Sequence, residues 1–121
     1  MKQRVVVVDD DPEILAVISN MLEQEYEVSV FSDGQQALDY LRSGVTPSLV
    51  MSDLRMPGLN GFMVLSEARR IFPELKTMLF SGFIEPTSES EKGILSRFAN
   101  DVMRKPVRFS ELMTKVHRLI D

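Results

Sequence analysis

Short, continuous apolar runs alternate along this chain with longer stretches of helical periodicity, and this alternation restricts the possible folds more than any other feature. An uninterrupted apolar run of about 4–8 residues is typical of a strand that is covered on both faces. Strands that alternate with helices indicate repeated β-α-β units, and therefore a mostly parallel sheet with helices on both sides. The five predicted strands span residues 4–8, 27–30, 48–51, 77–80 and 101–103.

The helices between these strands are predicted from apolar residues at helical spacing and from their start signals. Asp11 followed by Pro12 resembles an N-cap with proline at the first helical position, and Ser32 with Gln35 resembles a capping box. Segment 85–98 is polar and contains a glycine, so it is predicted as a weakly held helix. The first helix is expected to bury Ile14, Val17, Ile18, Met21 and Leu22, and the last one Phe109, Leu112, Met113, Val116, Leu119 and Ile120.

The bulk composition favours one globular domain and excludes several kinds of function. The 121 residues suffice for one compact core, so residues 1–121 are expected to form a single domain. With 14 basic and 18 acidic residues the net charge is −4, which argues against direct binding of nucleic acid. The absence of cysteine excludes disulfides and thiol chemistry. No apolar run approaches the roughly 18–20 residues of a membrane span, and a cytoplasmic location is expected.

Ionisable or hydroxyl side chains follow four of the five predicted strands. Asp9 and Asp10 follow the first strand, Asp53 the third and Ser81 the fourth, and Lys105 comes shortly after the fifth. In an open parallel sheet the ligand site lies beyond the carboxyl ends of the strands. Each residue alone has an ordinary explanation as a helix cap, a turn or a loop residue. Their joint arrival at one edge of the sheet predicts a functional site there.

The three carboxylates at this edge are expected to require a cation. Two unit charges about 4 Å apart repel by about 4 kcal/mol at an effective dielectric near 20, so Asp9, Asp10 and Asp53 would raise one another's pKa or bind a metal ion. Oxygen ligands suit Mg²⁺, with Mn²⁺ as a substitute. Lys105 supplies a point charge for a phosphoryl oxygen, and Ser81 supplies a hydroxyl. These groups together predict phosphoryl transfer to an aspartate.

Four stretches of the chain together resemble the receiver domain of two-component response regulators. They are VVVVDDDPEIL, LVMSDLRMPGLNG, MLFSG and RKPV, and their order and spacing fit that family over residues 3–120. The resemblance implies a flavodoxin-like α/β fold, with a five-stranded parallel sheet in the order 2-1-3-4-5 and five helices on its two faces. It also implies a phosphorylatable signalling switch, not an enzyme, that assists its own phosphorylation and dephosphorylation.

The resemblance assigns the phosphoryl chemistry to three residues. Asp53 is the phosphoacceptor, which takes the phosphoryl group from a phosphohistidine of a sensor histidine kinase or phosphotransfer protein, and Lys105 and Ser81 hold phosphoryl oxygens. The peptide before the proline of the Lys-Pro pair is commonly cis in this family, so Lys105–Pro106 is expected to be cis. The downstream target is a protein partner or an output domain outside this chain, and a phosphorylation-dependent dimer is compatible with the family.

The resemblance also implies a metal site. Asp10 and Asp53 bind Mg²⁺ directly, Arg55 contributes its backbone carbonyl, and Asp9 acts largely through water. Many relatives have an acid at the position of Asp11, but capping of the first helix explains that residue without any metal.

The aromatic residue that commonly reads out phosphorylation in this family is missing from this sequence. The usual aromatic residue three positions before the lysine is replaced by Val102, so a rotating aromatic switch is missing. Segment 85–97 is therefore the expected mobile element. Phe83 either shields the acyl phosphate from water or is incidental, and His117 on the last helix is expected at the surface.

Two alternative functions use similar residues. A Mg²⁺-dependent phosphatase of the haloacid dehalogenase type also forms an aspartyl-phosphate; Asp9 and Asp11 satisfy its first spacing, but the residues that follow do not satisfy its second. Rapid multiple turnover of a small phosphate ester would favour this phosphatase, whereas one stoichiometric phosphorylation would favour a receiver. A flavin mononucleotide carrier is disfavoured because three aspartates after the first strand would repel the cofactor phosphate.

Overall fold

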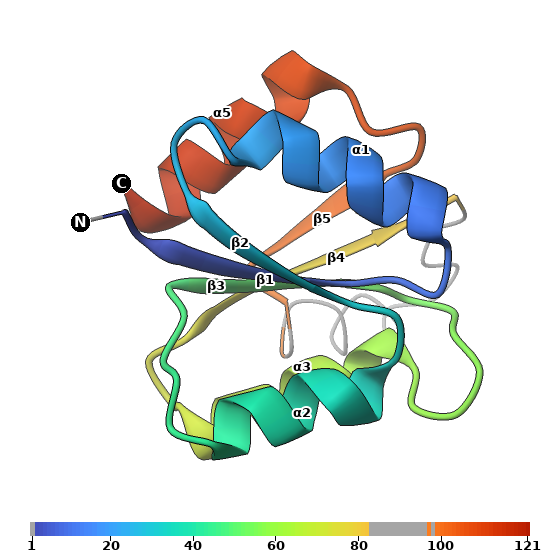
Figure 1. The fold of residues 1–121 in the computed structure, drawn as a ribbon, viewed down its shortest axis with the longest axis vertical. Coiled ribbons are helices and arrows are strands. Elements are labelled where there is room, and N and C mark those ends of the chain that lie inside the picture. Colours follow the sequence, from blue (N-terminus) through green and yellow to red (C-terminus); the bar gives the residue numbers. More distant parts are fainter. Residues whose placement is uncertain (1, 83–96, 98) are drawn as a thin grey trace.

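The first apolar run forms a strand inside a parallel sheet that has helices on both faces (Figure 1). The computed structural model describes residues 2–82, 97 and 99–121. The predicted helix at 85–98 lies outside these described residues, apart from residue 97. The described elements are β1 (Arg4–Val8), α1 (Pro12–Leu22), β2 (Glu27–Phe31), α2 (Gly34–Arg42), β3 (Leu49–Asp53), α3 (Gly61–Ile71), β4 (Lys76–Ser81), β5 (Asp101–Arg104) and α5 (Phe109–Ile120).

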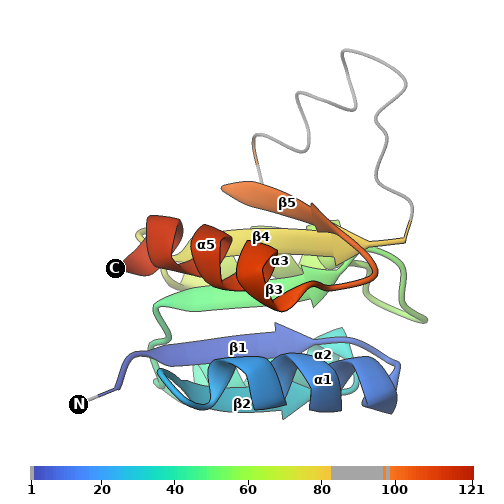
Figure 2. The same cartoon turned by 90° about the horizontal axis from the view of Figure 1, so that it is seen from above.

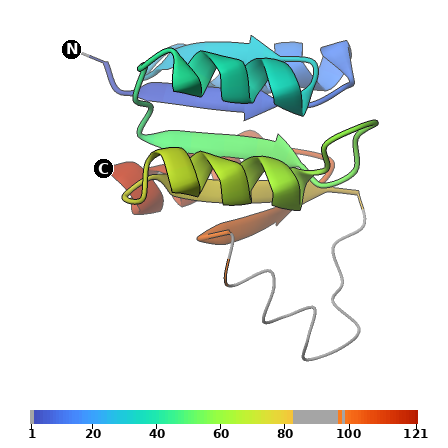
Figure 3. The same ribbon diagram turned by 90° about the horizontal axis from the view of Figure 1, so that it is seen from below.

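All four strand pairings are parallel, and the strand order is β2-β1-β3-β4-β5. Helices α1 and α5 lie on one face of the sheet (Figure 2), and α2 and α3 lie on the other (Figure 3). The predicted flavodoxin-like fold and strand order are therefore confirmed. The order reverses at β1, whose neighbours are β2 and β3, and this places the predicted ligand site at the carboxyl ends of β1 and β3.

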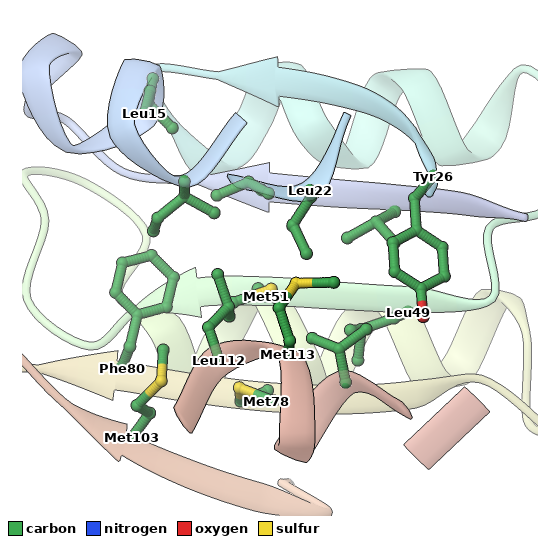
Figure 4. Packing of buried hydrophobic residues seen from close by; sticks show 14 residues of the cluster. Leu15, Leu22, Tyr26, Leu49, Met51, Met78, Phe80, Met103, Leu112 and Met113 are labelled. Carbon is green, nitrogen blue, oxygen red and sulfur yellow. The ribbon is translucent and has the colours of Figure 1, made fainter. Parts of the chain in front are cut away.

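The unbroken apolar run of β1 is explained by burial on both faces of the sheet. Val5 and Val7 belong to the core between the sheet and helices α1 and α5, whereas Val6 and Val8 belong to the core on the side of α2 and α3. Figure 4 shows the first of these cores, whose buried side chains include Phe80, Met103 and Leu112. Both cores end at the carboxyl edge of the sheet, where the polar residues begin.

The predicted helical stripes are correct for part of each helix. In α1 the buried residues are Leu15, Ile18 and Leu22, whereas Val17 is 44% exposed. The apolar positions of α1 cover a wider arc than the sheet can contact, so the sequence pattern alone does not identify the buried edge of that arc. In α5, Phe109 is likewise 52% exposed at the first turn.

The two predicted helix starts have different outcomes. The side chain of Asp11 accepts a hydrogen bond from the amide of Glu13 at 2.9 Å and caps α1, as predicted. The capping box at Ser32 is wrong, because the side chain of Asp33 accepts from the amide of Gln36 at 2.8 Å. Helix α2 begins one residue later than the sequence pattern suggests, since Asp33 is an equally good acceptor.

Candidate functional site

The carboxyl edge of the sheet brings together five of the six predicted site residues. Asp53 and Ser81 are the last residues of β3 and β4, two and one residues beyond the predicted strand ends. The register continues to the edge, because Asp53 pairs with Phe80 and Ser81 with Arg104. Pairing with a neighbouring strand, not the apolar pattern, therefore determines where these strands end.

Three carboxylates form one acidic cluster at this edge. Asp9, Asp10 and Asp53 each offer an oxygen within 4.8 Å of the others. Asp9 is fully buried and Asp53 is 6% exposed, whereas Asp10 is exposed to solvent. Asp9 Oδ1 accepts a hydrogen bond from the amide of Asp11 at 2.9 Å, so the first turn of α1 orients this carboxylate.

The other oxygen of Asp9 is the strongest sign that this cluster can hold a cation. Asp9 Oδ2 is buried, and its ion-pair partner among the described residues is the ammonium of Lys105 at 3.0 Å. Asp53 shares this ammonium at 3.5 Å. A buried carboxylate oxygen that shares one ammonium with a second carboxylate, beside a third, fits the oxygen ligands that a divalent cation such as Mg²⁺ prefers.

Lys105 is the cation that the site itself provides. Its Nζ lies 3.0 Å from Asp9 Oδ2 and 3.5 Å from Asp53 Oδ1, and its backbone amide donates to the carbonyl of Ser81 at 2.9 Å. The Lys105–Pro106 peptide is cis, as predicted. The ammonium also lies 5.5 Å from the centre of the Phe80 ring. Lys105 follows β5, the neighbour of β4, and its ammonium reaches the acidic cluster past the ring of Phe80 on β4.

Phe80 is a site residue that the sequence analysis did not identify. The sequence pattern identifies it only as the apolar end of a strand, but its ring lies 5.5 Å from the ammonium that pairs with both buried aspartates. Its position in the sequence could have indicated this role, because Phe80 directly precedes Ser81 on the strand between Asp53 and the Lys-Pro pair.

The electrostatics of the site favour added positive charge. Burial raises the pKa of the Asp53 carboxyl, the charge of Asp9 raises this pKa further, and Lys105 only partly offsets both effects. Burial likewise raises the pKa of Asp9, against the amide of Asp11 and the ammonium of Lys105. Burial would lower the pKa of Lys105, but the carboxylates of Asp9 and Asp53 outweigh it and raise that pKa overall. Two buried carboxylates therefore share one ammonium and remain short of positive charge.

The remaining predicted residues are placed with fewer contacts. Ser81 is 4% exposed at the same edge, and Arg55 is exposed in the loop between β3 and α3. Val102 is half-buried on β5. It occupies the position, three residues before Lys105, at which the resemblance implies an aromatic residue. Phe83 lies outside the described residues. His117 is 42% exposed on α5, as expected, and pairs with Glu25 at 3.0 Å.

Fold and site together define a class of protein. A flavodoxin-like sheet carries at its carboxyl edge a buried carboxylate, a cluster of oxygen ligands for a divalent cation, a lysine and a hydroxyl. These are the components of a domain that accepts a phosphoryl group on an aspartate.

Comparison with known proteins agrees with this class. The family described as "Response regulator receiver domain" matches residues 5–117. The chain is 35% identical to a protein-glutamate methylesterase/protein-glutamine glutaminase from Methanospirillum hungatei, over 85% of this chain and 31% of that protein. It is 33% identical to the DNA-binding response regulator MtrA of Mycolicibacterium smegmatis, over 96% of this chain and 50% of that protein. The chain thus spans half or less of the length of these relatives.

A solved structure shows the same fold. The crystal structure of a CheY-like response regulator receiver domain protein from Methanospirillum hungatei superimposes with a TM-score of 0.89 and 24% identity, and covers all of this chain and 95% of that one.

The chain belongs to the response regulator receiver domain family. It is a receiver domain of two-component signalling, a class that accepts a phosphoryl group and switches conformation. The family match favours this function over the phosphatase and the flavin carrier. In the described part of the chain, no helix has the length and apolar character needed to cross a membrane.

Proposed function

We propose that Asp53 is the residue of this receiver that accepts the phosphoryl group, from a phosphohistidine of a sensor kinase or phosphotransfer protein. The observation that carries this proposal is the position of Asp53 Oδ1, 3.5 Å from Lys105 Nζ at the opening of the acidic cluster. Asp9 is deeper in the site and is completely buried, so Asp53 is the more accessible of the two paired carboxylates. Because Asp9 and Asp53 share the ammonium of Lys105, the negative charge of Asp53 is only partly neutralised, and its carboxylate oxygen can act as a nucleophile.

The acidic cluster supports Mg²⁺ as the cofactor, with Mn²⁺ as a substitute. Asp10 and Asp53 would bind the ion directly together with the backbone carbonyl of Arg55, and Asp9 would act largely through water. When bound, such an ion neutralises charge on the carboxylates and on the incoming phosphoryl group. The sharing of one ammonium by Asp9 and Asp53 fits this role, because an added cation would supply the positive charge that the two buried carboxylates lack.

The residues of the chain divide the chemistry among them. The Asp53 carboxylate attacks phosphorus; the phosphorus–nitrogen bond to the donor histidine breaks, and a phosphorus–oxygen bond to Asp53 forms. Lys105 stabilises the negative charge as it moves from the carboxylate to the phosphoryl oxygens, because its ammonium already lies beside the reacting oxygen. Ser81 supplies a hydroxyl at the neighbouring strand end. The same groups assist the later hydrolysis of the acyl phosphate.

The phosphorylated domain then acts on a partner. Phosphorylation adds about −1.5 to −2 charges at a site that already has excess negative charge, and this changes the balance between conformations. The downstream element is a protein partner or an output domain outside this chain. The relatives include a DNA-binding regulator and a methylesterase, which shows that such domains serve different outputs.

The test is stoichiometric phosphorylation by acetyl phosphate with Mg²⁺, read by intact mass. We expect one phosphoryl group on the wild type, none on Asp53→Asn, and none on the wild type with a chelator. Asp39→Asn is the matched control, because it makes the same change on the exposed side of α2, and it should react like the wild type. A mass gain in Asp53→Asn equal to that of the wild type would move the phosphoacceptor elsewhere.

A further inference from the structure

Glycine 61, the first residue of α3, touches the backbone of the proposed phosphoacceptor. A Cβ atom at this position would lie 2.5 Å from the carbonyl oxygen of Asp53 and 2.9 Å from Cα of Leu54. The amide of Gly61 donates to the carbonyl of Leu54 at 2.9 Å. The first turn of α3 therefore packs directly on the Asp53–Leu54 peptide, at a distance that no side chain permits.

Two further contacts hold the same peptide. The hydroxyl of Ser52 donates to the carbonyl of Asp53 at 2.9 Å, and Ser52 is completely buried. The amide of Leu54 donates to the carbonyl of Phe80 on β4 at 3.0 Å. The peptide that carries Asp53 is thus held by its own strand, by the neighbouring strand and by a helix.

We propose that Gly61 and Ser52 are positioning residues for phosphoryl acceptance: together they hold the Asp53 carbonyl so that the carboxylate stays beside Lys105 and the acidic cluster. This inference rests on the proposed role of Asp53. Neither residue touches the reacting atoms. Both act on the backbone from the α2 and α3 side of the sheet, since Ser52 follows Val50 of that core by two strand positions, whereas the side chain of Asp53 follows Met51 of the opposite core.

The physical reason is the sensitivity of transfer reactions to position. Displacement of a reacting group by about 1 Å can lower a rate by about 10²-fold, even when the change lies away from the chemistry. An added methyl group at Gly61 must move either α3 or the Asp53 peptide, because two of its three nearest atoms would be backbone atoms. A shift of the peptide moves the carboxylate relative to Lys105.

The chain offers a matched control for this steric change in Gly34. Gly34 is also buried, is also the first residue of a helix on the same face of the sheet, and would also place a Cβ 2.5 Å from its nearest atom. That atom is Cγ2 of Val64, and the next is Cβ of Leu59, so the conflict involves side chains of α3 and its preceding loop. Alanine at position 34 therefore conflicts with side chains and not with the Asp53 peptide, so it should disturb packing but change the phosphorylation rate less than alanine at position 61.

The experiment measures the rate constant of phosphorylation by acetyl phosphate and Mg²⁺, for Gly61→Ala and Gly34→Ala, together with the folded fraction from urea unfolding. We expect Gly61→Ala to lower the rate constant of the folded protein by about 10-fold or more, and Gly34→Ala to change it by less than about twofold. Both variants are expected to lose stability, so stability alone does not distinguish them. Equal rate constants for the two variants would overturn the inference.

A second pair of variants decides the question if Gly61→Ala does not fold. Ser52→Ala removes the hydroxyl without adding atoms and should lower the rate constant by about 3–10-fold, whereas Ser52→Thr keeps the hydroxyl and should restore most of it. A Ser52→Ala rate within about twofold of the wild type would overturn the inference. Failure of the proposed function gives a different pattern, in which the wild type gains no mass or Asp53→Asn gains as much as the wild type; this pattern overturns both.

Discussion

The two ends of the sheet hold their charged side chains in opposite ways. At the carboxyl end, the buried carboxylates of Asp9 and Asp53 share the ammonium of Lys105, at 3.0 and 3.5 Å. At the amino end, two contacts join single polar partners at short range: the hydroxyl of Tyr26 donates to Asp121 at 2.9 Å, and His117 pairs with Glu25 at 3.0 Å.

The difference follows from what each end does. The amino end joins β2 and α5 near the two ends of the chain (Figure 1), where satisfied polar contacts stabilise the fold. The carboxyl end holds excess negative charge, which is expected to cost stability and fits a site that accepts a phosphoryl group and, as proposed above, a cation. The four predictions below test this contrast, from the largest expected effect to the smallest.

The largest effect is expected for Lys105→Met. The substitution leaves Asp9 and Asp53 buried without their cation, so we expect the free energy of unfolding at neutral pH to fall by roughly 2–3 kcal/mol. We expect the phosphorylation rate to fall by about 10²-fold or more, because the group that follows the transferred charge is gone. Urea unfolding and intact-mass time courses measure the two effects.

Lys115→Met is the matched control for this prediction. Lys115 is as exposed as Lys105, at 22% against 21%, and pairs with one carboxylate, that of Asp101, at 3.0 Å. Its replacement should destabilise the domain by about 1 kcal/mol and leave the phosphorylation rate unchanged. Equal losses of stability and rate in the two variants would contradict a special role for Lys105.

Asp53→Asn should stabilise the metal-free domain. One carboxylate then remains for one ammonium, so the free energy of unfolding should rise by about 1 kcal/mol in chelator. Saturating Mg²⁺ should stabilise the wild type by about 1–3 kcal/mol through binding to the folded state, and should stabilise the variant much less. Thermal unfolding with and without Mg²⁺ tests both statements; a variant that is less stable than the wild type in chelator would refute the first.

Acid should reduce the difference between the wild type and Asp53→Asn. Burial and the charge of Asp9 raise the pKa of Asp53 above its usual 3.8, so Asp53 takes up a proton at a higher pH in the folded than in the unfolded state. Its contribution to stability is present below pH 3.8 and is lost as the pH rises through the folded pKa. The stability deficit of the wild type should therefore shrink, by less than about 1 kcal/mol, as the pH falls from 7 towards 3.8 in chelator. A deficit that grows in acid would contradict the direction of this shift.

At the amino end, Tyr26→Phe should affect stability alone. Loss of the hydrogen bond to Asp121 should lower the free energy of unfolding by about 0.5–1 kcal/mol and leave the phosphorylation rate unchanged. Burial, followed by the contact with Asp121, raises the pKa of Tyr26, so its contribution to stability should be lost as the pH rises above 10.0. Tyr40→Phe, which removes a longer contact of 3.3 Å to Ser29, is the control and should have a smaller effect.

The sequence by itself determined the five strands, the described helices between them and which side chains follow the strands; the helix predicted at 85–98 stays a prediction. Continuous apolar runs and helical periodicity are local patterns, and both come from the requirement to bury apolar side chains. The sequence also predicted that four polar residues lie at strand ends: Asp9, Asp53, Ser81 and Lys105. Because a parallel sheet brings all its carboxyl ends to one edge, this was enough to place them near one another.

Only the tertiary structure decided the contacts on which the chemistry depends. The exposure of Val17 depends on how helix α1 is rotated against the sheet. The other features depend on residues that are distant in the chain: the burial of Asp9, the ring of Phe80 beneath Lys105, and the contact of Gly61 with the Asp53 carbonyl. Local patterns cannot specify such distances, because they result from how strands pair and helices pack. The sharing of one ammonium by two buried carboxylates is therefore a property of the folded domain, not of any segment of its sequence.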